Sequence, residues 1–180
     1  ALALSYARGR PMPLFRGATS KVILACLPER RLTRLFVEHQ AEIRKAGLGR
    51  TREEFLACLK FIRREGYSIT RAEVDRGVVG IAVPVFGGER AVIGSLSIVF
   101  SEKRFPERHA VEVIAELKRV LGECGSIIGS LRVSLGDQIH EDGKKRIADL
   151  LAEIEKLADG GSIGMVTPLP CPNVIYLMLN

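Results

Sequence analysis

The part of the sequence best suited to bind a ligand is the predicted start of a helix at residues 17–21, which read Gly-Ala-Thr-Ser-Lys. Free backbone N–H groups at a helix N-terminus bind anions, and the helix dipole strengthens the attraction. We therefore expect a carboxylate ligand at Ala18, Thr19 and Ser20. The alternative is that Thr19 or Ser20 only caps the helix.

Two apolar stretches, residues 77–86 and 91–100, are predicted to form a β-hairpin beside this helix start. Both are rich in Val and Ile, and Gly87-Gly88 lies in the turn between them. Because both stretches are apolar at nearly every position, both faces of the hairpin are expected to be buried. Small residues in the strands permit a close approach, so the far end of the ligand is expected to face Gly80, Ser97 and Val99. Alternatively, Ser97 only bonds its own strand neighbours.

Catalytic and metal-binding chemistry finds little support among the histidines and cysteines. No histidine pair has the spacing of zinc ligands, and the three are His39, His109 and His140. The cysteines form no C-x-x-C pair and are expected to be reduced intracellular thiols; they are Cys26, Cys58, Cys124 and Cys171. We expect no catalytic residue, metal or cofactor, and hence no enzyme. A cysteine-based enzyme stays open as an alternative, and it would need a reactive thiol in the ligand site.

Charge is unevenly spread along the 180 residues, which carry a net charge of +6. Residues 1–76 hold 16 Lys and Arg against 8 Asp and Glu, whereas residues 77–180 hold 11 against 13. The arginines of the basic part alternate with apolar positions, as on the solvated face of a helix, so direct nucleic-acid binding is not predicted. No apolar run approaches the roughly 20 residues that span a bilayer, so we expect a cytoplasmic protein without a membrane partner.

Hydrophobic periodicity and turn residues predict the remaining elements. Thr51 and Glu54 have the spacing of a capping box, and Gly66 is suited to end the helix that they begin. The predicted helices cover residues 17–27, 28–40, 51–66, 105–135 and 144–158. Besides the hairpin, the predicted strands cover residues 2–8, 67–74, 162–167 and 174–179.

Several short motifs resemble the effector-binding domain of the IclR family of bacterial transcription regulators. The resemblance covers about residues 4–131, and the order and spacing of the motifs carry it. The motifs are Pro11-Met12-Pro13-Leu14, the stretch from Gly17 to Ala25, Arg64-Glu65-Gly66-Tyr67-Ser68, Gly77 with Ile81-Ala82-Val83-Pro84-Val85, and Ser95-Leu96-Ser97-Ile98.

The resemblance implies an α/β (α+β) fold of the GAF-like type, with a curved, mostly antiparallel six-stranded sheet flanked by helices. The family's ligand contacts fall on positions that correspond here to Ala18, Thr19, Thr70, Gly80, Ser97 and Val99. Several family members have an acidic residue near the position of Thr70 and a polar one at that of Val99. Their replacement disfavours a very small polar ligand, and an apolar or aromatic carboxylate would suit Val99, Phe15 and Phe86 better.

The order of the elements departs from that of the family. Residues 1–135 correspond to the core of the domain, whereas residues 136–180 are similar to the helix and two strands that normally precede it. We expect these residues to complete the same sheet in a permuted order, with Asn180 near Ala1. The alternative is that they begin a second copy of the domain. The family's winged helix-turn-helix is not found in this sequence.

Taken with the resemblance, these features predict a ligand-sensing domain. A small organic acid would bind it, and the domain would transmit binding to a DNA-binding domain outside this sequence. The resemblance also implies a homodimer or homotetramer. The alternatives are the cysteine-based enzyme, on a GAF-like fold, and a pure oligomerisation module.

Overall fold

The computed structural model describes residues 12–86, 92–105, 110–135 and 162–166, together with Asp149 and Ala152. Its helices are α1 (Ala18–Ala25), α2 (Glu29–Glu38), α3 (Gln40–Lys45), α4 (Arg52–Glu65) and α5 (Ala110–Leu135). Its strands are β1 (Ser68–Arg71), β2 (Val78–Phe86), β3 (Val92–Ser101) and β4 (Ser162–Val166), and a short 3₁₀ turn covers Glu102–Arg104. The fold class is α+β, as predicted.

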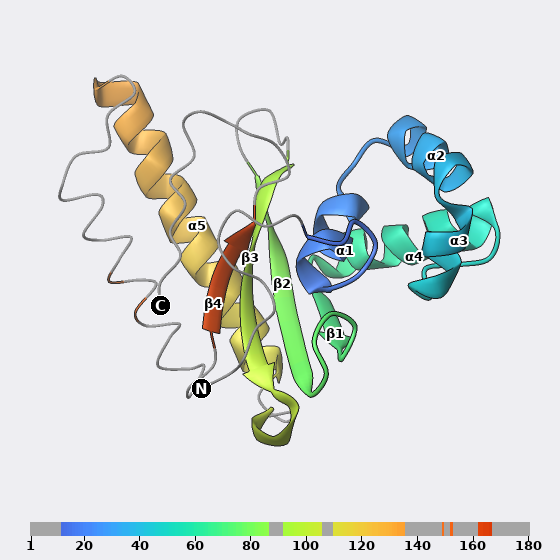
Figure 1. Cartoon of the computed structure of the whole chain (residues 1–180). Helices are drawn as coiled ribbons and strands as arrows, with labels where there is room; N and C mark the ends of the chain where they lie inside the picture. Colours follow the sequence, from blue (N-terminus) through green and yellow to red (C-terminus); the bar gives the residue numbers. More distant parts are fainter. Residues whose placement is uncertain are drawn as a thin grey trace.

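The four described strands form one antiparallel sheet in the order β1-β2-β3-β4 (Figure 1). The predicted hairpin is confirmed as β2 and β3, although its turn at residues 87–90 lies outside the described residues. β1 is shorter than predicted, because Ala72 turns the chain with a φ of 52° directly after Arg71. The predicted strands at residues 2–8 and 174–179, and most of the predicted helix at 144–158, also lie outside the described residues.

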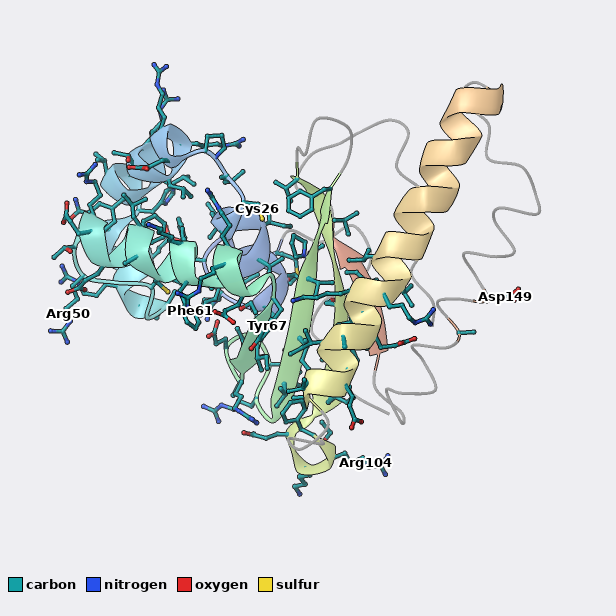
Figure 2. The ribbon with its side chains drawn as sticks, turned by 180° about the vertical axis from the view of Figure 1, so that it is seen from behind. Cys26, Arg50, Phe61, Tyr67, Arg104 and Asp149 are labelled. Carbon is teal, nitrogen blue, oxygen red and sulfur yellow. The ribbon has the colours of Figure 1, made fainter. Side chains whose placement is uncertain are left out.

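Large apolar side chains cover one face of this sheet and pack against α5. Side chains alternate between the two faces along a strand, so this face takes every second residue of β2 and β3. Figure 2 shows α5 crossing the sheet on this side. The buried cluster consists of Ile81, Val83, Leu96, Ile98 and Phe100 from the sheet and Val113, Ile114, Leu117 and Val120 from α5.

Helices α2, α3 and α4 form a second core on the other side of the sheet, beyond α1 (Figure 1). Leu24 and Ala25 of α1 belong to this core, so α1 joins the two parts of the molecule. The other buried members are Phe15, Leu32, Phe36, Ile43, Leu48, Phe55 and Leu59. The helix predicted over residues 28–40 is confirmed as α2, but α3 was not predicted; the chain leaves helical geometry at His39 and starts α3 at Gln40.

The ends of α4 follow the sequence prediction. The Glu54 N–H donates to Thr51 Oγ1 at 3.2 Å, and Gly66 ends the helix in the left-handed conformation. The Glu54 carboxylate accepts from the N–H of Arg50 at 2.7 Å. A capping box would use the N–H of Thr51 instead, one residue later in the chain. The helix start is thus fixed by two hydrogen bonds that depend only on local sequence.

Leu117 is the position at which the packing of α5 on the sheet is most directly tested, because its side chain is 0% exposed. We expect Leu117→Ala to lower the free energy of unfolding by about 2–5 kcal/mol through lost burial and a cavity. Val111 on the same helix is 76% exposed, and Val111→Ala should change stability by less than about 0.5 kcal/mol. Urea denaturation measures both, and equal effects would contradict the observed packing of α5.

Candidate effector-binding site

The second face of the sheet carries small and hydroxyl-bearing residues, and α1 packs against it. Alternation along the strands places the predicted site residues Thr70, Gly80, Ser97 and Val99 on this one face. Thr70 pairs with Gly80 and Gly80 pairs with Val99, so these three form one row across the sheet. Ser97 lies in the neighbouring row, opposite Ala82.

Helix α1 lies close to the sheet at Gly80. A Cβ atom placed on Gly80 would lie 3.7 Å from the Cβ of Ala18 and 3.6 Å from the Oγ1 of Thr70, which is ordinary van der Waals contact. Ala18 also forms a small buried cluster with Val22 and Ala82. The structure therefore brings Ala18 together with the sheet residues, but the space above Gly80 admits no more than a methyl group.

All eight residues of α1 are buried, including Thr19, Ser20 and Lys21. The prediction that Thr19 or Ser20 caps the helix was wrong. Gly17 is the N-cap, with a φ of 86°, and no side chain caps the helix. The hydroxyl of Ser20 instead donates to the carbonyl of Pro13 at 2.7 Å. The first N–H to bond within the helix is that of Lys21, so those of Ala18, Thr19 and Ser20 have no partner inside the helix.

A carboxylate of the protein itself lies at the start of α1. Glu73, in the loop between β1 and β2, accepts the N–H of Gly17 at 3.0 Å with one oxygen. Its other oxygen lies 2.5 Å from the ammonium of Lys21, which also donates to the carbonyl of Ala46 at 3.4 Å. The side chains of Lys21 and Glu73 are only 10% and 27% exposed. Sequence reasoning missed this pair because its members lie 52 positions apart.

The loop that supplies Glu73 also contacts α1 through Val74. A Cβ at Gly17 would lie 2.9 Å from Val74 Cγ2, closer than real Cβ atoms approach. Gly17 therefore satisfies two demands, because it supplies the positive φ and leaves room for Val74. Glycine at the helix start was visible in the sequence, but its reason lies in this tertiary contact.

The aromatic residues expected to favour an apolar ligand do not gather at this site. Phe15 is buried in the helical core, with its ring centroid 5.3 Å from that of His39. Phe86 is 51% exposed at the end of β2. Val99 is half-buried in its strand. The face beneath α1 is instead rich in buried hydroxyls, which belong to Ser68, Thr70, Ser95 and Ser97.

Ser95 is a member of this face that the sequence alone marked only as part of a family motif. It is 0% exposed, lies opposite Pro84 and is two residues from Ser97 on β3. Its Oγ has no hydrogen-bond partner. No sequence signal separates it from Ser97, because an unsatisfied hydroxyl is a property of the packed structure.

The two cysteines whose side chains the structure describes are not set up as nucleophiles. Cys26, at the end of α1 (Figure 2), and Cys58, in α4, are free thiols. Burial raises the pKa of the Cys26 thiol, although the guanidinium of Arg63 opposes this. Burial also raises the pKa of Cys58. Both thiols therefore stay protonated at neutral pH, and a protonated thiol is a poor nucleophile.

Two further properties of the described ranges bear on metal and membrane binding. No group of three or more His, Cys, Asp or Glu side chains there is placed to hold a metal ion. No helix in the same ranges is both long and apolar enough to cross a membrane.

Comparison with known proteins places this fold among bacterial transcription regulators. Residues 1–123 match the family described as bacterial transcriptional regulator IclR, C-terminal. The chain is similar to the HTH-type transcriptional regulator KdgR of Dickeya chrysanthemi, with 36% identity over 61% of this chain and 36% of the relative. It is 34% identical to the HTH-type transcriptional regulator XynR of Escherichia coli, over 53% of this chain and 38% of the relative.

Solved structures agree with the sequence matches. The C-terminal domain of E. coli KdgR is 30% identical and superposes with a TM-score of 0.56, covering 66% of this chain and 72% of that one. A double mutant of the PobR inducer-binding domain from Acinetobacter, in complex with 3-hydroxybenzoic acid, shares the fold. It is 21% identical, with a TM-score of 0.52 over 68% of this chain and 75% of that one.

Fold and matches together define a C-terminal domain of transcription regulators. The chain belongs to the IclR family. It spans less than half the length of the curated relatives that it matches. These relatives are transcription regulators and not enzymes, in agreement with the sequence prediction.

The pair formed by Lys21 and Glu73 should matter for stability because both side chains are largely buried. Glu73→Gln leaves the Lys21 ammonium without its carboxylate and should lower the free energy of unfolding by about 1–3 kcal/mol, the cost of a buried donor that has lost its partner. Adding Lys21→Met should recover part of this loss, because the unpaired charge is removed. Urea denaturation of both single variants and the double variant measures the coupling, and strictly additive effects would refute it.

Gly80 tests the close approach of α1. Gly80→Ala should fit, leaving stability unchanged or raised by up to about 1 kcal/mol. Gly80→Leu should push against Ala18 and lower stability by about 1–3 kcal/mol. Thermal melts of the two variants separate these outcomes. Equal stability of the two variants would mean that α1 does not lie against Gly80.

Proposed function

We propose that this chain is a ligand-sensing domain that binds a small organic acid between α1 and the sheet. It transmits binding to a DNA-binding domain elsewhere in the regulator. Membership of the IclR family and the HTH-type names of the relatives support the regulatory part of the proposal. The observation that carries the ligand-binding part is the face of buried hydroxyls beneath a helix whose first N–H groups have no partner within the helix.

The proposed ligand site contains all the predicted residues, but the ligand is not expected to contact all of them equally. Ala18, Thr19, Ser20, Thr70, Gly80, Ser97 and Val99 remain its proposed members. Because Ala18 covers Gly80, the ligand is proposed to lie along β3, beside Ser97 and Val99. Its carboxylate would lie near the start of α1, where backbone N–H groups and the helix dipole favour negative charge. The Lys21 ammonium lies in the same turn and already holds Glu73.

Helix α1 is the element through which binding would be transmitted. It packs on the sheet through Ala18 and Val22, and on the helical core through Leu24 and Ala25. Movement of α1 would therefore move α2, α3 and α4 relative to the sheet. A ligand can drive such a change only if it binds one arrangement more tightly than the other.

The remaining parts of the proposal concern assembly. We propose that residues 136–180 complete this sheet in a permuted order, an idea supported by the antiparallel pairing of β4 with β3. A homodimer or homotetramer in the cytoplasm, acting on DNA only through another domain, completes the proposed setting. If the chain were a pure oligomerisation module, it would assemble without responding to any acid.

Thermal melting with a panel of acids tests the proposal. Pyruvate, hexanoate, gluconate and 3-hydroxybenzoate sample small, apolar, hydroxylated and aromatic carboxylates. At about 100 times its Kd, a bound acid should stabilise the protein by about 2.7 kcal/mol, and the melting temperature should keep rising with the logarithm of the acid concentration. Failure of every acid in the panel to raise it would count against ligand sensing.

Ser97→Ala is the matched site variant for the panel, because it removes a hydroxyl beside which the ligand is proposed to lie. It should weaken binding of the stabilising acid by about tenfold, the loss expected for one buried hydrogen bond. Ser101→Ala, at the end of the same strand, is the control and should leave the affinity unchanged. An equal loss in both variants would show that Ser97 has no special part in binding.

A further inference from the structure

Ser95 presents an unsatisfied hydroxyl inside the protein. The residue is 0% exposed, and its Oγ has no hydrogen-bond partner. Buried hydroxyls in native structures are nearly always hydrogen-bonded, and those that are not call for a reason. Among the buried side-chain polar atoms of the described residues, the Ser95 Oγ alone lacks a partner.

The surroundings of Ser95 explain why the chain itself supplies no partner. Its neighbour across β2 is Pro84, which has no N–H to donate. β1 pairs with β2 only as far as Ala82, so it does not reach this row. On β4, Val166 lies opposite Ser95, and valine has no polar side-chain group; Gly164 lies opposite Ser97 in the adjacent row. The residues around the Ser95 hydroxyl on the neighbouring strands therefore supply it with no hydrogen-bond partner.

The position of Ser95 relates it to the proposed ligand site. It lies on the same face of the sheet as Ser97 and Val99, because all three occupy alternate positions of β3. Two residues along a strand span about 6–7 Å, so a short organic acid beside Ser97 can reach Ser95 with its far end. The direction from Val99 to Ser95 leads away from the row of Gly80, where Ala18 lies close.

We propose that Ser95 is a specificity residue of this site, hydrogen-bonding a hydroxyl or carbonyl oxygen at the end of the ligand remote from its carboxylate. This inference rests on the proposed ligand-sensing function and narrows it. The ligand is then a hydroxylated or oxo acid, in contrast to the apolar or aromatic acid that Val99 suggested from sequence. The bond would supply the partner that the Ser95 Oγ lacks.

A site built in this way discriminates strongly against ligands without the polar group. A buried donor or acceptor left unpaired in the complex lowers affinity more than a missing methylene does. The unliganded protein already contains the unpaired hydroxyl, so removing it should not lower stability. This expectation separates a ligand-facing hydroxyl from one with an internal partner in solution.

The test compares Ser95→Ala with the wild-type chain by calorimetric titration of three six-carbon acids. Hexanoate has no hydroxyl, 6-hydroxyhexanoate has one at its far end, and gluconate is hydroxylated along its chain. Wild type should bind at least one hydroxylated acid about tenfold or more tightly than hexanoate, and Ser95→Ala should lose that preference. Ser101→Ala, at the end of the same strand, should keep it.

The possible failures point to different conclusions. If Ser95→Ala keeps the preference, or weakens all three acids equally, the role of Ser95 is refuted while ligand sensing stands. A clearly lowered melting temperature of unliganded Ser95→Ala would show an internal partner and also refute it. If none of the three binds wild type but pyruvate does, the role of Ser95 is refuted, because pyruvate has no oxygen remote from its carboxylate. Binding of no acid at all would refute the sensing function itself.

Discussion

The alternation of side chains along β2 and β3 is the constraint on which the rest of the structure depends. One face takes Ile81, Val83, Leu96 and Ile98, and the other takes Gly80, Ala82, Ser95 and Ser97. Burial of the first set drives α5 onto the sheet, since apolar area removed from water is the main source of stability. The second set offers little apolar area but lets a helix approach closely. The same two strands thus form an apolar core with α5 on one face. On the other face, small and hydroxyl-bearing residues allow α1 to lie close to the sheet.

The position of α1 depends on polar contacts at its start as well as on apolar packing. Glu73 connects the loop after β1 to Gly17 and Lys21, and Lys21 reaches Ala46 at the end of α3. Sheet, loop, α1 and helical core therefore meet at one half-buried carboxylate. A ligand that carries its own carboxylate to this end of α1 would enter a site where negative charge is already present and already paired. Competition between the ligand carboxylate and Glu73 for the same positive groups would link ligand binding to movement of α1.

Much of the fold was predictable because it depends on short-range chemistry. The hairpin strands, the Thr51 cap, the Gly66 end and the length of α5 to Leu135 follow from local pattern and turn residues. Helix α3 was not predicted, because its six residues are too few to show a helical period. The start of α1 was placed correctly, yet its cap was misread. A Thr or Ser near a helix start is usually a cap, and here Gly17 with Glu73 takes that part.

The sequence by itself determined the family, the strands of the hairpin and the residue types available to a ligand, because these are properties of motif order and periodicity. Only the tertiary structure decided which of those residues meet. It placed Thr70, Gly80 and Val99 in one row, brought Ala18 over Gly80, and moved Phe15 into another core. It also left the Ser95 hydroxyl buried without a partner. Pairing register, helix approach and hydrogen-bond satisfaction arise from contacts between distant segments, which no local pattern records.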